Sequence, residues 1–337
     1  MEELLYNLLS ESHTIVLIFV IIFSLISLSK GADILVDEAV SLSVHWNVPK
    51  IVIGATIISL GTTLPEVSVS VLAAIKGNPD LALGNAIGSI IVDTGLILGL
   101  CALIGNLHVD KTTIDKQGKI QVMAAIFLAI ISLPIFSNEN TGKIHQWMGW
   151  IFLLLLIIYI FTSIKWAKNT NTVNTDDIFT EEKSPIIIQL FKLFIGITIV
   201  IISSRILIPS VEITAIRVGI PQSIIAATLV AFGTSLPELI TSVTAVKKGH
   251  SEIALGNVIG ADVLNILFVI GSAAAVTKQG LIVPTNYYML QFPTMLIILL
   301  SFRYFAKNSK TKKITKLEGL FLVIIYLIYL ILNYVLI

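Results

Sequence analysis

Charged side chains are scarce in this 337-residue chain: Asp, Glu, Lys and Arg make up 13% of it, whereas 55% of its residues are hydrophobic. Soluble domains carry about 25% charged residues, so this chain has too few polar side chains to cover a soluble globule of its size. Its formal net charge is only +1, which argues against nucleic acid as a partner. We therefore expect a protein whose main partner is the lipid bilayer, with no obligatory protein partner.

Cysteine and histidine are also rare. The single cysteine, Cys101, excludes an internal disulfide, and we expect it to be a small buried hydrophobic residue. None of the five histidines falls in the repeated motifs described below, which argues against zinc or copper chemistry. The N-terminus begins Met1-Glu2-Glu3 and lacks a basic leading region, so we expect no cleaved signal peptide.

Long apolar runs are abundant. A membrane-spanning helix needs about 20 mostly apolar residues, and runs of about that length occur near residues 14–43, 48–75, 80–105, 118–135, 147–166, 185–216, 219–247, 251–276, 286–304 and 314–336. The polar, Asn- and Thr-rich stretch 167–184 separates the first five runs from the last five. The sequence therefore predicts an all-α membrane protein with ten transmembrane helices.

The two halves of the chain share a repeated motif. Residues 61–66 (GTTLPE) and 84–93 (GNAIGSIIVD) are matched, 172 residues later, by residues 233–238 (GTSLPE) and 256–265 (GNVIGADVLN). An internal repeat at a fixed offset indicates two structurally related halves. We predict a first repeat at 1–166 with its motif at 56–99, a cytoplasmic linker at 167–184, and a second repeat at 185–337 with its motif at 228–271.

Five helices per repeat place the second half in the membrane with the opposite orientation, so the repeat is predicted to be inverted. Basic residues predict which side is cytoplasmic. If the N-terminus is outside, the outer loops contain only Lys76, Lys143, Arg217 and Lys278, and most other basic residues lie on the cytoplasmic side. The prediction is a multi-pass protein of the cell (inner) membrane with both termini extracellular or periplasmic.

Each repeat carries a proline followed by an acid inside apolar sequence. Pro65 has no backbone N–H, and its ring clashes with the carbonyl of Gly61, so helix 2, and by the repeat helix 7, should be broken. Non-helical backbone at membrane depth is tolerated only where protein, water or an ion satisfies it. Glu66, with Thr62 and Thr63 on the same helical face, offers the oxygen ligands that hard cations such as Ca²⁺ and Na⁺ prefer.

The second segment of each motif supplies further oxygens at four-residue spacing on one helix face. The residues are Asn85, Ser89 and Asp93 in the first repeat, and Asn257, Ala261 and Asn265 in the second. The glycine pairs beside them are typical of close helix packing. An acid at mid-bilayer costs roughly 3 kcal/mol on insertion scales, so packing alone does not account for Glu66, Glu238, Asp93 and Asp262. Asp262 has no acidic counterpart, because residue 90 is Ile.

These motifs resemble the two alpha repeats of the cation/calcium exchanger superfamily, specifically the prokaryotic sodium/calcium exchangers. The resemblance covers essentially the whole chain apart from the linker. It implies that Glu66 and Glu238 bind Ca²⁺ together with the backbone carbonyls of Thr62 and Thr234. It also implies Na⁺ sites that share the two glutamates and add oxygens from Ser59, Thr63, Ser89, Ala231 and Ser235, with Ser59 and Ala231 contributing their backbones.

The chain departs from the family pattern in the second segment of each motif. Asp93 stands where Asn is common and Asn265 where Asp is common, so the total charge of this pair is conserved; both are candidate ligands. Ala261 replaces a serine whose hydroxyl helps to bind Na⁺, and Asp262, a further candidate, adds a carboxylate beside that gap. These departures leave open the number of Na⁺ ions and whether Na⁺ is the coupling ion.

The resulting expectation is a secondary-active antiporter that exchanges Na⁺ for Ca²⁺ by alternating access, with the long first and sixth helices sliding across the rest. It is not expected to be an enzyme or to need a cofactor beyond the transported Ca²⁺ and Na⁺, because no nucleophile and base pair occurs in a membrane segment. Two alternatives remain. The same fold would also serve an H⁺/Ca²⁺ exchanger, whose carboxylates trade the metal for protons, and broken helices with buried acids would also suit a cation channel.

Overall fold

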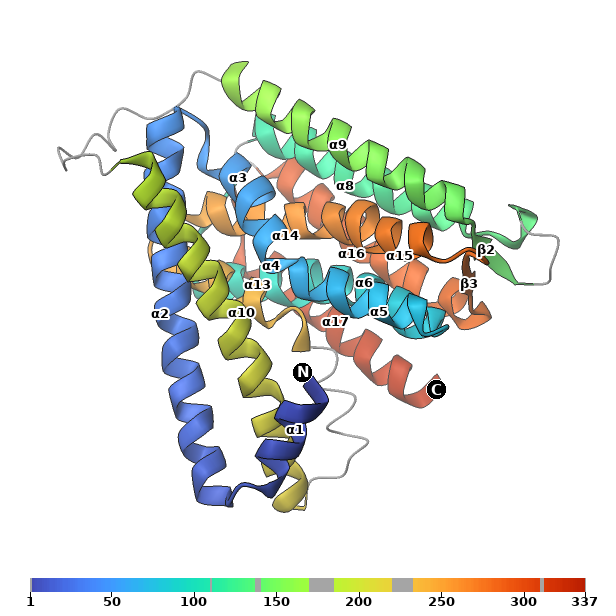
Figure 1. The fold of residues 1–337 in the computed structure, drawn as a ribbon. Coiled ribbons are helices and arrows are strands. Elements are labelled where there is room, and N and C mark those ends of the chain that lie inside the picture. Colours follow the sequence, from blue (N-terminus) through green and yellow to red (C-terminus); the bar gives the residue numbers. More distant parts are fainter. Residues whose placement is uncertain are drawn as a thin grey trace.

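The computed structural model describes residues 2–109, 111–136, 141–169, 185–219, 233–309 and 312–336, which are almost entirely helical (Figure 1). In the first half the elements are α1 (Glu2–Glu11), α2 (Thr14–Trp46), α3 (Lys50–Ile53), η1 (Gly54–Ile58), α4 (Ser59–Thr62), α5 (Leu64–Ile75), α6 (Pro79–Ile91), η2 (Val92–Ile97), α7 (Leu98–Ile104), β1 (Leu107–His108), α8 (Lys111–Ile131), η3 (Pro134–Phe136), β2 (Gly142–Ile144) and α9 (Gln146–Asn169).

The second half repeats this order. Its elements are α10 (Ile186–Arg217), α13 (Leu236–Lys247), α14 (Ser251–Leu264), η6 (Asn265–Ile270), α15 (Gly271–Val276), β3 (Leu281–Val283), η7 (Tyr287–Gln291), α16 (Phe292–Asn308), β4 (Lys313–Ile314) and α17 (Lys316–Leu336). Here η3 is a 3₁₀ turn, and η1, η2, η6 and η7 are π-helical turns.

Seven helices in the described part of the chain are long and apolar enough to span a membrane, and an eighth span results if the bent pair 50–62 and 64–75 is counted as one. The all-α membrane class is therefore confirmed. The expected run 118–135 corresponds to helix α8, which is not among these seven apolar helices. Most of the linker 167–184 and the first part of the run 219–247 lie outside the described residues. The short helix α1 was not predicted.

The predicted break in the second helix is present. Helix α4 ends at Thr62 and α5 begins at Leu64, and the two axes differ by 45°. Pro65 lies in the first turn of α5, where its missing N–H costs no hydrogen bond. In the second half α13 likewise begins at Leu236, one residue before Pro237. The proline therefore starts a new helix in each half rather than kinking a continuous one.

Two long spans that follow the broken helices form the centre of the bundle. The span Ser251–Val276 is 94% buried and Pro79–Ile104 is 78% buried, whereas the most apolar window of α2 is 28% buried. Helices α2 and α10 stand side by side at one flank of the molecule (Figure 1). The second segments of the repeated motifs thus occupy the interior, and the long first and sixth helices cover one face of it.

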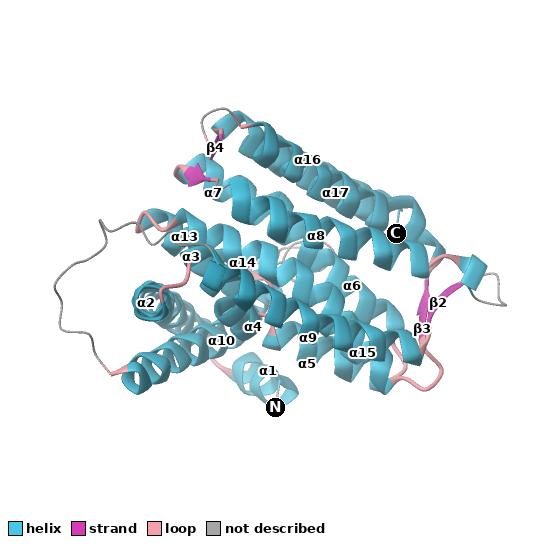
Figure 2. Ribbon diagram, turned by 90° about the horizontal axis from the view of Figure 1, so that it is seen from above, coloured by secondary structure: helices cyan, strands magenta, loops and turns pink. Residues whose placement is uncertain are grey.

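Two very short antiparallel sheets join the halves. Strand β1 pairs with β4, with Leu107 opposite Ile314, and β2 pairs with β3, with Gly142 opposite Val283. Each sheet therefore takes one strand from each half. The two sheets lie at opposite ends of the bundle (Figure 2).

Candidate functional site

The two motif glutamates are buried at equivalent places. Glu66 follows Pro65 in the first turn of α5, Glu238 follows Pro237 in the first turn of α13, and each residue is 1% exposed. The N-terminus of a helix favours a negative charge. The proline that begins each helix therefore also places the acid where the helix dipole stabilises its charge.

A set of hydrogen bonds links the first motif to the second. The Thr234 hydroxyl donates to Asn85 Oδ1 at 3.0 Å, and Asn85 Nδ2 donates to the backbone carbonyl of Glu66 at 3.2 Å and to Ser70 Oγ at 3.0 Å. The side chain of Asn85 is thereby fixed from three directions. It holds α6 against α5 and connects both to the broken segment of the other half.

The second half contains the counterpart of this set. The Thr62 hydroxyl contacts Asn257 Oδ1 at 3.4 Å, and Asn257 Nδ2 donates to Ser242 Oγ at 3.1 Å. The threonine, asparagine and serine of this set each lie 172 residues from their equivalents in the first set. In both sets the threonine comes from one half of the chain and the asparagine from the other. The repeated sequence therefore produces repeated contacts, and each half supplies a threonine to the other.

The carboxylates face the opposite half of the molecule. Glu66 interacts with Thr234 and Glu238 with Thr62, but the oxygens of both carboxylates are buried and accept no hydrogen bond of good geometry. Like charges also face one another: Glu66 interacts electrostatically with Glu238 and Asp93. In the part of the chain that the structure describes, no three His, Cys, Asp or Glu side chains form a compact metal-binding group. A cation there would draw on hydroxyl, amide and carbonyl oxygens as well as carboxylates.

The other predicted ligands of the first repeat lie in the same region. Ser89 Oγ is 3.4 Å from Thr234 Oγ1, and Asp93, one turn further along, interacts with Ser235 and Glu238. Both residues are at most 3% exposed. The structure therefore brings Ser89, Asp93 and Ser235 to the region of the two glutamates.

Asp93 and its repeat partner Asn265 both sit in π-helical turns. Asp93 lies in η2 (Val92–Ile97) and Asn265 begins η6 (Asn265–Ile270). Such turns interrupt the α-helical hydrogen-bond pattern and are frequent at functional sites. Asn265 Oδ1 is buried without a hydrogen-bond partner. These turns were not predicted, because no proline or glycine pattern specific to them occurs at both positions.

The three remaining predicted ligands, Ser59, Thr63 and Ala231, differ in whether their oxygens are free to bind an ion. The Ser59 carbonyl already accepts the backbone N–H of Thr63 at 2.9 Å and the Thr62 hydroxyl at 3.3 Å, so an ion there would have to compete with the Thr62 hydroxyl. Thr63 Oγ1 is buried and has no hydrogen-bond partner. Ala231 lies outside the described residues.

Asp262, unlike the two glutamates, accepts hydrogen bonds. Its Oδ2 accepts hydrogen bonds from Thr94 Oγ1 and Gln121 Nε2, both at 2.5 Å, and its Oδ1 is buried without a partner. The carboxylate also interacts electrostatically with Glu238 and Asp93. Asp262 therefore contributes charge to the site while its side chain is held by η2 and α8.

The sequence reasoning did not identify four residues that support the site. Ser70 and Ser242 carried a usable signal, because both are serine at the common offset of 172. Gln121 and Thr94 carried none, since their equivalents are Pro293 and Ile266. Only the fold places Gln121, on α8, beside Asp262.

Glycines on α14 allow it to pack closely against α3 and η1. A Cβ added to Gly256 would lie 2.1 Å from the carbonyl oxygen of Ile51, and one added to Gly260 would lie 2.6 Å from that of Ala55. Because these obstacles are backbone atoms, α14 fits against α3, η1 and α4 only with glycine at these positions. The predicted packing role of this glycine pair is confirmed.

A cavity of about 420 Å³ reaches the site from one side. Its walls come from α10, α5, α1 and the residues around the start of α13, and include Pro65, Thr234, Pro237 and Glu212. Thr234 also belongs to the hydrogen-bonded set around Asn85, so the cavity extends to the edge of this set.

Comparisons with known proteins agree with this arrangement. The family model described as "Sodium/calcium exchanger protein" matches residues 16–165 and 188–335. An uncharacterised membrane protein, MJ0091 of Methanocaldococcus jannaschii, is 33% identical over 308 residues, which are 91% of this chain and 94% of that protein. The sodium/calcium exchanger MaX1 of Methanosarcina acetivorans is 27% identical, over 93% of this chain and 97% of its own.

Solved structures show the same fold. The sodium-calcium exchanger NCX_Mj, in a crystal soaked with 2.5 mM Na⁺ and 10 mM Sr²⁺, superposes with a TM-score of 0.77 at 32% identity, covering 94% of this chain and 98% of that one. In a crystal soaked without Na⁺ and Ca²⁺ the TM-score is 0.79 at 30% identity. On the extent of the family match and of these relatives, the chain belongs to the sodium/calcium exchanger family.

Proposed function

We propose that this protein is a secondary-active antiporter that exchanges Na⁺ for Ca²⁺ across the cell membrane. The observation that carries the proposal is the pair Glu66 and Glu238, one from each half, both 1% exposed and both lacking a formed hydrogen bond. Within the described ranges neither glutamate takes part in a salt bridge with a basic residue. Buried carboxylates of this kind need a positive partner, and a transported cation is the simplest one.

The same energetics explain how two ion fluxes become coupled. A site with several uncompensated carboxylates is costly to move through a low-dielectric interior, so the carrier should reorient readily only when cations neutralise it. Ca²⁺ and Na⁺ then compete for one site. If three Na⁺ exchange for one Ca²⁺, one net charge crosses per cycle, and the membrane potential contributes about 2.3 kcal/mol per 100 mV.

The proposed ligand set is the one expected from the sequence. Ca²⁺ would be held by the carboxylates of Glu66 and Glu238 and the carbonyls of Thr62 and Thr234. Na⁺ would share the two glutamates and add Ser89, Asp93, Ser235, Asn265, Thr63 and the backbones of Ser59 and Ala231. Asp262 is proposed to contribute its charge to the site; Thr94 and Gln121 both donate to its Oδ2, so only its Oδ1, which has no hydrogen-bond partner, is available to a cation.

We further propose that the ten-helix, inverted-repeat topology applies, with both termini outside. Two features support it. The hydrogen-bonded sets around Asn85 and Asn257 recur at the offset of 172, and the two interhalf sheets lie at opposite ends of the bundle (Figure 2). An inverted repeat produces this placement, because its symmetry axis lies in the membrane plane.

The decisive experiment is calcium uptake into vesicles reconstituted with the purified protein. Uptake driven by an outward Na⁺ gradient, with the pH gradient collapsed by an ionophore, supports Na⁺/Ca²⁺ exchange. Uptake that needs an imposed pH gradient and ignores Na⁺ identifies an H⁺/Ca²⁺ exchanger. Calcium flux that persists with no counter-ion identifies a channel. Vesicles containing the Glu66→Gln variant provide the control for leak.

A further inference from the structure

Helices α2 and α10 are packed together as one unit. A Cβ added to Gly31 on α2 would lie 2.8 Å from Ile199 Cγ2 on α10, and one added to Gly196 on α10 would lie 3.0 Å from the backbone nitrogen of Leu35 on α2. A salt bridge of 3.3 Å between Lys192 and Glu38 also joins the two helices. Movement of one helix relative to the other would disrupt this packing, so they are expected to move together.

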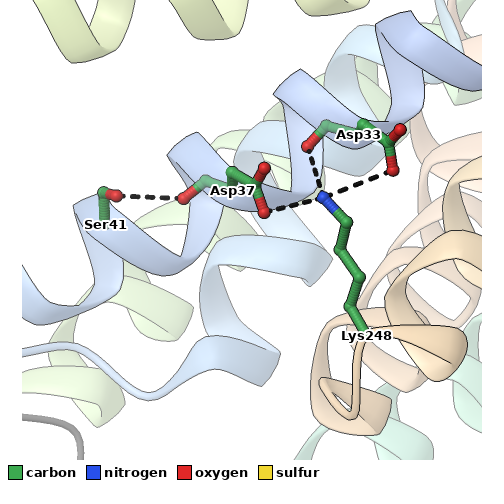
Figure 3. Close-up of polar contacts among 4 residues, drawn as sticks. All are labelled: Asp33, Asp37, Ser41 and Lys248. Carbon is green, nitrogen blue, oxygen red and sulfur yellow. Dashed lines mark hydrogen bonds and ion pairs between the residues drawn. The ribbon is translucent and has the colours of Figure 1, made fainter.

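One lysine ties this unit to the rest of the bundle. Lys248, at the end of α13, places its ammonium 2.8 Å from Asp37 Oδ1, 3.3 Å from Asp33 Oδ1 and 3.2 Å from the Asp33 carbonyl oxygen (Figure 3). Asp33 and Asp37 are four residues apart, so they share a face of α2.

The lysine remains charged in this position. Partial burial acts to lower the pKa of Lys248, but the hydrogen bonds and charges of Asp37 and Asp33 outweigh it and raise the pKa above its ordinary value. The free energy gained from this shift is therefore present throughout the neutral range and is lost only as the pH rises through the raised pKa.

The ion pair and the access cavity lie at opposite ends of α13. The cavity is lined by Thr234 and Pro237, where α13 begins, whereas Lys248 follows its last residue. Twelve helical residues separate the two ends, a distance of about 18 Å. The site is thus reached from the cavity side, and α2 is fastened to α13 on the other side.

The repeat does not reproduce this contact in the other half. The offset of 172 extends into α2 and α10, where Ile34 and Leu35 match Ile206 and Leu207. Lys248 corresponds to Lys76, but the two aspartates correspond to Arg205 and Pro209. Neither of these offers a carboxylate, so the contact of Lys248 with two aspartates has no counterpart at the matching positions of the other half.

We propose that Lys248, Asp33 and Asp37 form an ion-pair latch that holds the α2–α10 unit in the position seen here, in which the cavity is open. The inference rests on the proposed alternating access, in which this unit slides over the bundle. Sliding must break the latch, whereas the Lys192–Glu38 pair moves intact. Because the other half lacks a matching latch, the carrier at rest favours the open-cavity state.

The test measures how often the cavity is open. A cysteine introduced at Val69, which lines the cavity, reports through its labelling rate with a polar maleimide supplied on both sides of proteoliposomes. The native Cys101 is fully buried and does not compete. We expect Lys248→Gln to lower the ratio of open to closed protein about two- to fivefold, the factor that corresponds to a partly exposed ion pair, and the labelling rate to fall with the open fraction. The double variant Asp33→Asn/Asp37→Asn removes the acidic side of the same ion pair and should lower the labelling rate equally.

Two matched controls keep the experiment specific. Glu38→Gln breaks the salt bridge inside the α2–α10 unit, and Lys76→Gln changes the equivalent lysine of the other half; both should leave the labelling rate unchanged. Combining Lys248→Gln with Asp33→Asn/Asp37→Asn should slow labelling no more than either variant alone, because each variant already removes the same ion pair.

Several outcomes would overturn the proposal. These are unchanged or faster labelling of Lys248→Gln, equal slowing by Glu38→Gln, or full additivity of the combined variant. Labelling reports conformation and needs no ion gradient, so it fails or succeeds independently of calcium uptake. If the wild-type protein showed no Na⁺-driven calcium transport, the proposed function would be wrong. The labelling data would still show whether the ion pair of Lys248 stabilises the open-cavity state.

Discussion

Gln121 on α8 donates a 2.5 Å hydrogen bond to Asp262 on α14, although 141 residues separate them in the chain. Both side chains are fully buried. This contact explains how a carboxylate without an equivalent in the other half is accommodated at mid-bilayer. It also places a fourth negative charge close to Asp93 and Glu238.

That charge makes Asp262→Asn an informative variant. We expect its half-saturating Na⁺ concentration to rise roughly five- to tenfold, a coupling typical of interacting sites, because the substitution removes a charge near the cation site with little change in shape. Na⁺-dependent calcium uptake measures it. Ser163→Ala, a buried polar residue hydrogen-bonded to Gln117, is the control. Unaltered Na⁺ dependence in Asp262→Asn would remove the residue from the site.

The two motif glutamates should each be indispensable. Glu66→Gln or Glu238→Gln keeps the side-chain volume and removes one charge from a shared site, so we expect exchange to fall to background. Glu252→Gln, in the first turn of α14, changes a glutamate outside the paired motifs and should retain exchange. Near-normal transport by either motif variant would contradict the assignment.

The hydrogen-bonded sets around Asn85 and Asn257 should matter equally. Asn85→Ala and Asn257→Ala each remove two or more hydrogen bonds, and we expect each to weaken calcium affinity about tenfold, since an unsatisfied buried partner costs about 1–3 kcal/mol. Calcium titration of uptake compares them. Ser68→Ala, which loses an exposed hydrogen bond to the Leu64 carbonyl, should have no effect. A large effect from one asparagine and none from the other would argue against functional equivalence of the halves.

Glycine at position 256 is required by backbone packing. Gly256→Ala places a Cβ 2.1 Å from a carbonyl oxygen, and we expect it to destabilise the protein by about 3 kcal/mol, the upper end of overpacking effects. Gly95→Ala meets Ile298 Cδ1 at 3.1 Å and Tyr326 Cβ at 3.2 Å, which are longer contacts with side-chain atoms, and should cost about 1 kcal/mol. Thermal unfolding in detergent ranks the two variants. Equal stability would mean that α14 is free to shift away from α3.

The sequence alone predicted which residues of the two halves correspond, because the repeat is a strong constraint. The offset of 172 pairs Glu66 with Glu238 and Asn85 with Asn257, and the structure places all four in one connected region. The helix break at Pro65 followed from the missing N–H of proline. These features are local or repeated, and one sequence suffices to reveal them.

The remaining features depend on residues that meet only through the fold. Nothing in the spacing of Gln121 and Asp262, or of Lys248 and Asp33, indicates contact, because α8 and α2 reach their partners through the packing of several intervening helices. The π-helical turns at Asp93 and Asn265 likewise have no simple sequence rule.

The sequence by itself determined that this protein lies in a membrane, consists of two related halves and carries one buried acid after the proline of each motif, because apolar composition and proline act locally and the repeat is visible in the chain itself. Tertiary structure decided which oxygens surround those acids, which side of the site has a cavity and where α2 is fastened. Those relationships are set by the closest approach of helices, which depends on glycine contacts and side-chain volumes far apart in the chain.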